Sequence, residues 1–193
     1  GWRTDECLPE AISFYRSIEA LLGKSFCHPI GLHRIHGSDD ERQLWATRML
    51  EDGWMDHIES SEPSSAKPWF KQPFGGAPVH SAGFVSTLEY LDAARTWLKD
   101  QNLLIEEPFL HDDLDCSKPL LCWKDVQCTE VVFCEGYKLN ENPWFPEVYL
   151  NPAKGELLII EAPDLPQEIF NGKVYGVPLG NNQFRVGSTY SWN

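Results

Sequence analysis

Two side chains in the last quarter of the sequence have the chemistry to hold a carboxylate. Tyr175 lies in the segment KVYGVPLG, and Arg185 follows a tight turn, GNN, at residues 180–182. With the turn centred on Asn181, position 175 pairs near 187, so Tyr175 and Arg185 are expected on the same face of a sheet. A phenol beside a guanidinium suits a carboxylate, which arginine can bind bidentately. Alternatively, Arg185 is an exposed sheet residue and Tyr175 an ordinary sheet aromatic.

A histidine-rich segment, HPIGLHRIH, raises a metal site as one interpretation. It places His28, His33 and His36 close together. Pro29 and Gly31 argue against the helix that would put His33 and His36 on one face. A solvated segment between two helices is therefore the favoured interpretation, and no metal site is predicted.

Other catalytic arrangements have little support. The acidic segment HDDLD at 111–115 lacks the glycine and distal glutamate of an EF-hand, and it is interpreted as an acidic turn. Carboxylate pairs near tryptophans suggest glycosidases, but 29 acidic residues produce such pairs by chance. The patterns GxSxG, GxGxxG and GxxxxGK[ST] are absent. A Cys/His dyad stays open because nothing singles one out, so no catalytic residue is identified.

The cysteines do not form a zinc pattern. Four of the six, Cys116, Cys122, Cys128 and Cys134, recur every six residues, and there is no CxxC pair. Neighbouring cysteines at this spacing share a strand face, so a disulfide or two is conceivable. Reduced thiols in a cytosolic protein are the favoured interpretation.

Charge and hydropathy exclude several partners. The net charge of −13 disfavours nucleic acid and anionic membranes, which both require an excess of Lys and Arg. No apolar run approaches 18 residues, and no signal peptide is visible, so a cytoplasmic protein without a membrane span is predicted. The chain starts without Met and stops straight after an alternating run, which suggests a segment of a longer protein.

Helices are predicted mainly in the first half of the chain. Residues 8–23 begin with a proline in the first turn and end at Gly23. Residues 38–53 begin with a capping box of Ser38 and Glu41 and end at Gly53. Residues 84–102 form the strongest helical pattern. The Ser-, Pro- and Gly-rich stretch at 60–78 indicates an exposed loop.

Strands follow the helices, which indicates an α+β fold with a mostly antiparallel sheet flanked by helices. Residues 157–191 are expected to hold at least two long antiparallel strands, with helices covering one face of their sheet. The apolar run at 131–134, which stops at Gly136, is typical of a fully buried strand. The predicted strands lie at residues 103–106, 120–124, 128–134, 156–161, 173–179 and 183–191.

Four segments in order resemble the FAD-dependent oxidoreductases of the D-amino-acid oxidase and glycine oxidase superfamily. In that family a strand reading roughly vVxaxGxw is followed by P-x-[KR]-G-[EQ], then Y-x-x-P, then hxhGxTY. The matching segments here lie at 131–136, 152–156, 175–178 and 184–190. GGAPVHSAGFVSTLEYLDAARTWLKDQN is similar to the segment that enters the family's substrate domain. Cys134 and Glu135 depart from the small residues common there.

The resemblance implies that residues 1–193 are a single excised substrate-binding domain. Residues 130–137 would be a strand that returns to an FAD-binding domain, which the chain itself lacks. The full-length protein would oxidise the C–N bond of an amine or amino acid by hydride transfer to FAD. The fragment alone would bind no FAD and be inactive. The alternative is a stand-alone module that binds a sugar or peptide without catalysis.

The resemblance also implies roles for eight residues. The substrate-side residues are Tyr175, Arg185, Thr189 and Tyr190. Arg185 is included because of its place in the hairpin. Those facing the flavin are Glu135, Gly136, Lys154 and Gly155.

Overall fold

The computed structural model describes residues 3–51, 53–59 and 69–192. The chain divides into two compact units. Unit 1 comprises Gly1–Leu103 and Glu156–Thr189, and unit 2 comprises Leu104–Gly155 and Tyr190–Asn193. Each unit has its own sheets, and each is described separately.

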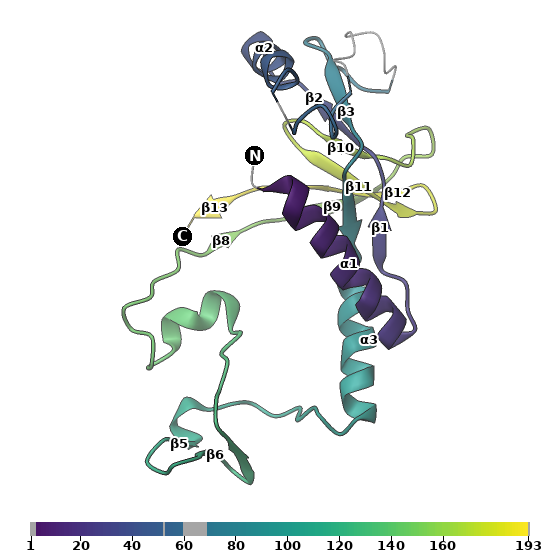
Figure 1. Ribbon diagram of the computed structural model, residues 1–193. Coiled ribbons are helices and arrows are strands. Elements are labelled where there is room, and N and C mark those ends of the chain that lie inside the picture. The colour runs from purple at the N-terminus through teal and green to yellow at the C-terminus, as the bar shows by residue number, and fades with distance from the viewer. Residues whose placement is uncertain (1–2, 52, 60–68, 193) are drawn as a thin grey trace. The chain divides into compact units, whose positions relative to one another are not determined.

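The main element of unit 1 is a six-stranded sheet in the order β3-β2-β10-β11-β12-β9 (Figure 1). All neighbours are antiparallel except β2 and β10, which are parallel. The sheet confirms the α+β class and the antiparallel strands expected within 157–191. Its strands are β2 Leu32–Ile35, β3 Gly76–Val79, β9 Leu157–Glu161, β10 Ile169–Asn171, β11 Tyr175–Gly180 and β12 Gln183–Gly187.

The turn between β11 and β12 forms where the sequence indicates. Gly180, Asn181 and Asn182 have φ angles of 83°, 50° and 60°. Glycine and asparagine tolerate this left-handed region better than other residues, which explains GNN at this position. The turn joins β11 to β12, and the register of the hairpin shifts by one residue between Pro178 and Gly180.

An aromatic row covers one face of this sheet. Phe170 and Phe184 lie 6.2 Å apart between ring centroids, and Phe70 packs on Phe170 at 5.0 Å. Gly176, which pairs with Phe170, has no room for a side chain because a Cβ would lie 1.9 Å from the Phe170 ring. His33 continues the row, with its ring parallel to that of Phe70. This face therefore forms the core of unit 1.

The three helices form close to their predicted positions. α1 runs over Thr4–Leu22 and ends at Gly23, whose φ is 64°. α2 spans Asp39–Arg48, and the Ser38 hydroxyl accepts a hydrogen bond from the Glu41 N–H, while the Glu41 carboxylate accepts one from the Gly37 N–H. α3 spans Thr87–Asp100, and α1 and α3 pack against each other within unit 1.

Several boundaries differ from the predictions. α2 ends five residues before Gly53, and residues 84 and 85 belong to a strand instead of the third helix. This strand, β4 Gly83–Val85, pairs with β1 Cys27–Pro29. The expected exposed loop at 60–78 ends in β3, and its residues 60–68 lie outside the described residues.

The expected helical cover does not reach the edge of the six-stranded sheet. All five residues of β9 are exposed, and they include Leu158 at 69% and Ile159 at 64%. Side chains alternate along a strand, so both faces of β9 are open. α1 packs against β1 of the two-stranded sheet.

The prediction of a solvated histidine segment is wrong. His33 and His36 are each only 1% exposed, because the segment that carries them forms β2 inside the sheet. Within the described ranges, no group of three or more His, Cys, Asp or Glu side chains is arranged to hold a metal ion.

A buried glutamate joins α1 to β1. Glu19 is 8% exposed, and its Oε1 accepts hydrogen bonds from the N–H groups of Phe26 and Cys27 at 2.6 and 2.7 Å. These two bonds, with help from Arg16, lower the pKa of Glu19 from 4.5 to about 2. The ionised carboxylate therefore holds the connection between the helix and the strand.

We expect Glu19 to make folding stability depend on pH. Its pKa is lower in the folded state, so its contribution is full above pH 4.5 and is lost as pH falls towards 2. The difference in unfolding free energy between the native chain and Glu19→Gln should shrink over that interval in urea titrations. The exposed Glu10 on the same helix provides the control, Glu10→Gln. A difference that stays constant from pH 7 to pH 2 would contradict this role.

Unit 2 contains a three-stranded antiparallel sheet, a small two-stranded sheet and two 3-10 helices. All six cysteines of the chain are free thiols. The strands are β5 Leu114–Asp115, β6 Leu121–Trp123, β7 Val126–Cys128, β8 Ala153–Lys154 and β13 Ser191–Trp192, and the 3-10 helices are η1 His111–Asp113 and η2 Gly136–Glu141.

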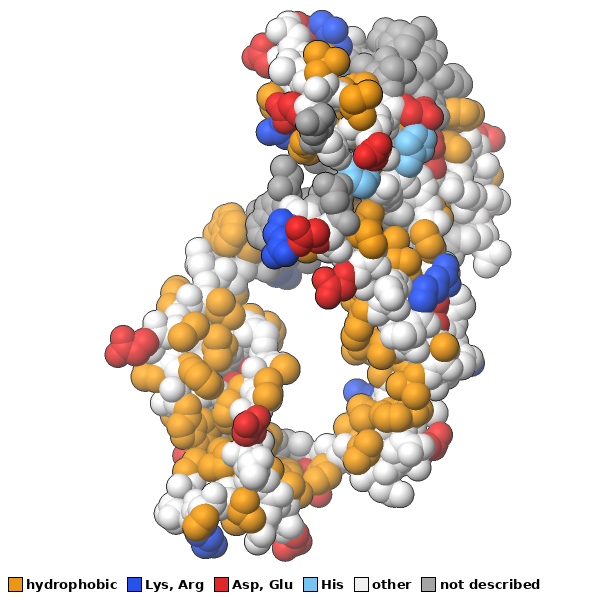
Figure 2. Space-filling model, in the orientation of Figure 1, with side chains coloured by type: hydrophobic (Ala, Val, Ile, Leu, Met, Phe, Trp, Pro, Cys, Tyr) orange, Lys and Arg blue, Asp and Glu red, His pale blue; other side chains and the backbone are white. Residues whose placement is uncertain are grey.

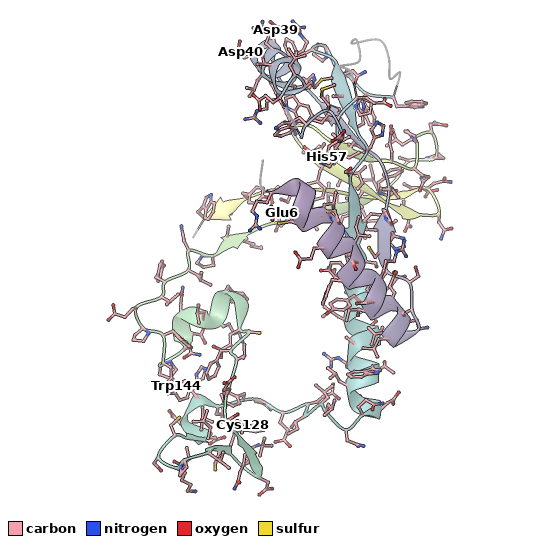
Figure 3. All side chains as sticks on the ribbon, viewed as in Figure 1. Glu6, Asp39, Asp40, His57, Cys128 and Trp144 are labelled. Carbon is pink, nitrogen blue, oxygen red and sulfur yellow. The ribbon has the colours of Figure 1, made fainter. Side chains whose placement is uncertain are left out.

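Aromatic rings hold unit 2 together. Phe133 stacks on Trp144, which is labelled in Figure 3, at 5.3 Å between centroids. His111 contacts both rings, and Phe109 stacks on Trp123. Other apolar side chains remain on the surface of this unit, where Figure 2 shows orange atoms gathered. Unit 2 therefore has a small core with much exposed apolar surface.

The prediction of a buried strand at 131–134 is wrong. The segment has no strand partner in the described part of the chain, and Val132 is 82% exposed. The side chains still alternate between the interior and solvent, although the segment is not in a sheet. Phe133 points into the aromatic cluster, and Val132 faces solvent. The predicted strand at 103–106, and the part of the strand predicted beyond Cys128, are also absent, because no strand pairs with either segment in the described part of the chain. No helix in the described ranges has the length and apolar character needed to cross a membrane.

Candidate functional site

The register of β11 and β12 places Tyr175 and Arg185 on one face of the sheet. Tyr175 pairs with Gly187, and Val177 pairs with Arg185. Because side chains alternate, Tyr175 and Arg185 share the face opposite the aromatic row. Both side chains are half-buried. The prediction of a shared face is confirmed.

Two further polar residues lie in register with Tyr175. Asn171 is its partner on β10, and Arg34 is the partner of Asn171 on β2. The Arg34 guanidinium donates to Asn171 Oδ1 and, at 2.8 Å through Nε, to Glu41 Oε1. The face therefore carries a polar row of Arg34, Asn171 and Tyr175. This row could not be predicted from local patterns, because β2 and β10 are far apart along the chain.

The charge of Arg34 is compensated. Burial alone would raise the pKa of Glu41, but the Gly37 N–H and the Arg34 guanidinium together lower it. Glu41 is thus an ionised partner for Arg34, which makes Arg34 a structural cation in this row.

Arg185, in contrast, has no ion-pair partner among the described residues. Its neighbour across the β9 ladder is Ile159, and Leu157 pairs with Gly187 one step along the same face. Gly187 allows this close packing, since a Cβ there would lie 2.4 Å from Leu157 Cδ2. An arginine without an internal carboxylate partner is available to bind an anionic ligand. The arrangement can bind a carboxylate next to the Tyr175 phenol.

Thr189 closes the end of the β9–β12 ladder. Its N–H donates to the Glu156 carbonyl at 3.2 Å, and its Oγ1 accepts from the Glu156 N–H at 3.1 Å. Thr189 therefore fixes the strand that carries Arg185. Tyr190 follows at once but belongs to unit 2, where it is 73% exposed.

Glu135 makes two side-chain contacts within unit 2. Its carboxylate accepts from Asn142 Nδ2 at 2.7 Å and bonds to His111 Nε2 at 2.8 Å. The Asn142 bond and then the His111 ring lower the pKa of Glu135. Glu135 therefore links the aromatic cluster to Asn142, and its expected position towards the flavin stays a prediction.

The other three residues expected to face the flavin lie in unit 2. Gly136 has a φ of 59° and begins η2, with no atom within 4 Å of the position a Cβ would take. Lys154 lies on β8 opposite Ser191, and Gly155 follows it. Their contacts with FAD stay predictions.

The fold resembles solved structures of amine- and amino-acid-oxidising enzymes, whereas no protein-family model matches the sequence. Glycine oxidase from Geobacillus kaustophilus aligns with a TM-score of 0.77 at 18% identity, covering 96% of this chain and 54% of that one. Glycine oxidase from Bacillus cereus gives 0.69 at 16% identity, with 97% and 57% covered. Iminodiacetate oxidase from a Chelativorans species gives 0.66 at 10% identity, with 93% and 55% covered.

These likenesses confirm the expected resemblance at the level of fold. The chain spans about half the length of the structures it matches.

Proposed function

We propose that this chain is the substrate-binding portion of an FAD-dependent oxidoreductase that oxidises the C–N bond of an amino acid or another amine bearing a carboxylate. The observation that carries the proposal is the uncompensated Arg185 on the same sheet face as Tyr175. The shared fold with glycine oxidase and iminodiacetate oxidase supports it. No observation favours the stand-alone sugar or peptide module.

In this proposal the sheet face positions the substrate. Arg185 binds the carboxylate and Tyr175 borders it, with Ile159 of β9 beside Arg185. Bound FAD supplies the acceptor for a hydride. Neither Tyr175 nor Arg185 acts as a general base, and none is required if the amine binds neutral. In unit 2, Tyr190 remains a proposed substrate contact, and Lys154 and Gly155 remain proposed flavin contacts.

FAD is bound mainly by an FAD-binding domain of the same protein, outside these residues. Pyrophosphate affinity in such folds comes from a glycine-rich loop at a helix N-terminus, and the sequence contains no GxGxxG. The chain alone is proposed to be colourless and inactive, with residues 130–137 contacting that domain. The net charge of −13 supports a protein without a nucleic-acid partner.

An anaerobic titration of the full-length protein tests the proposal. We expect an amino acid to bleach the flavin absorption band in stoichiometric amounts, because two electrons pass to the cofactor. The same amine without its carboxylate should bleach the band only at much higher concentration. A preparation that contains no flavin, or whose flavin no amine reduces, would overturn the proposal.

A further inference from the structure

A cavity lies on the other face of the six-stranded sheet. It has a volume of about 480 Å3 and lies between the end of β2, the segment 69–74 and the residues that follow β10. Phe170 lines it, and Phe170 pairs with Gly176, so it faces away from the neighbouring Tyr175. The cavity is therefore separate from the proposed substrate face. Its size is in the range of small-molecule sites.

His36 gives this cavity a buried group without a partner. The residue lines the cavity and is 1% exposed, yet neither ring nitrogen makes a hydrogen bond within the described residues. Its ring only packs against Trp45, at 5.6 Å between centroids. Buried polar atoms nearly always have a partner, so two such nitrogens indicate a ligand that supplies one. His33 behaves differently, because its Nε2 bonds to Gln72.

Two lysines set the charge of the cavity. Lys71 and Lys173 both line it, and neither forms an ion pair with any described residue. The chain carries 29 acidic residues against 16 Lys and Arg, so two unpaired lysines at one cavity form a local positive site on an acidic protein. Lysine binds anions as a point charge without a fixed geometry.

The remaining lining is aromatic and apolar. Trp69 and Phe74 are 46% and 38% exposed, so their rings border the opening. A planar ring packs well against such side chains. The other lining residues are Ile35, Gly37, Phe70, Pro73, Phe170, Gly172 and Val174.

We propose that this cavity binds a small planar aromatic carboxylate. The ring packs against Trp69 and Phe74, and the carboxylate lies between Lys71 and Lys173. One carboxylate oxygen accepts a hydrogen bond from the buried His36 ring. The site is independent of the oxidoreductase function proposed above.

Calorimetry on the 193-residue chain with indole-3-acetate, and with indole-3-acetamide as the neutral control, tests this site. We expect the acid to bind and the amide to bind about tenfold more weakly, since the amide loses the charge-assisted contacts. His36→Phe fills the same space without the ring nitrogens and should raise the Kd for the acid about tenfold. Lys71→Met and Lys173→Met should each raise it severalfold. The control Lys24→Met, at a lysine outside this cavity, should leave it unchanged.

A spectroscopic readout keeps the test decisive if His36→Phe does not fold. The ring 15N shifts of His36 should change when indole-3-acetate is added to the native chain, because a nitrogen gains a hydrogen bond. Absence of binding at millimolar concentration would overturn the inference. Binding that Arg185→Ala abolishes while the two lysine variants retain it would place the ligand on the substrate face and also overturn the inference.

Discussion

Arg185→Ala in the full-length protein should raise KM for an amine bearing a carboxylate far more than for a neutral amine. Loss of a buried bidentate contact costs on the order of 2 to 5 kcal/mol, or about 30-fold to several thousandfold. Arg185 is half-buried, so we expect an effect near the lower end. Steady-state kinetics on a matched pair of substrates, with and without the carboxylate, measures it.

Two further variants make this test specific. Arg185→Lys keeps the charge but not the planar fork, so it should recover only part of the lost affinity. Arg42→Ala removes an exposed arginine that pairs with Asp39 on α2, and it should leave KM unchanged for both substrates. If Arg185→Ala changed KM only slightly and equally for the two substrates, Arg185 would be a surface residue. The proposed substrate site would then rest on Tyr175 alone.

Phe184→Ala should have the largest effect on stability. The side chain is fully buried between Pro178 and Ile160 in the ladders on either side, and it completes the aromatic row with Phe170. Truncation of such a phenylalanine costs about 3 to 5 kcal/mol, because it leaves a cavity that the sheet cannot close. That is a large part of the 5 to 15 kcal/mol that is typical of a whole domain.

Urea unfolding of the native chain and the variant measures the difference. Phe14→Ala is the matched control, because Phe14 is 52% exposed on α1 and the same atoms are removed. We expect the control to cost well under 1 kcal/mol. If the two variants were equally stable, Phe184 would not be a core residue. Phe184 and Arg185 are adjacent in the sequence but lie on opposite faces of the sheet. Substitution of Phe184 should therefore affect folding, and substitution of Arg185 should affect binding.

Local patterns predicted the parts of the fold that depend on few residues. The GNN turn marks where β11 and β12 are joined, and a register shift between Pro178 and Gly180 then gives the pairing of Tyr175 with Gly187. The end of α1 at Gly23 and the cap at Ser38 also follow from local chemistry.

Pairing between strands that are far apart in the sequence could not be predicted from local patterns. β2 and β10 pair in parallel although Leu32 and Ile169 are far apart in the sequence. This pairing buries His33, whereas the sequence suggested a solvated segment, and it brings Arg34 to Asn171. The strand predicted from the apolar run at 131–134 is absent because no partner strand lies beside it. An apolar run forms a strand only where a second strand can pair with it. Similarly, nothing local links His111 to Glu135.

The exposure of β9 has a consequence for handling the protein. This outermost strand offers four successive apolar side chains, Leu157–Ile160, and a row of backbone groups that no described strand pairs on its outer side. Such an edge is a template for another extended chain, and native proteins usually protect it with charge, proline or a bulge. Here only Glu156 and Glu161 flank the run. Two copies that meet at this edge gain ladder hydrogen bonds and bury leucine and isoleucine together, so self-association competes with solubility as concentration rises.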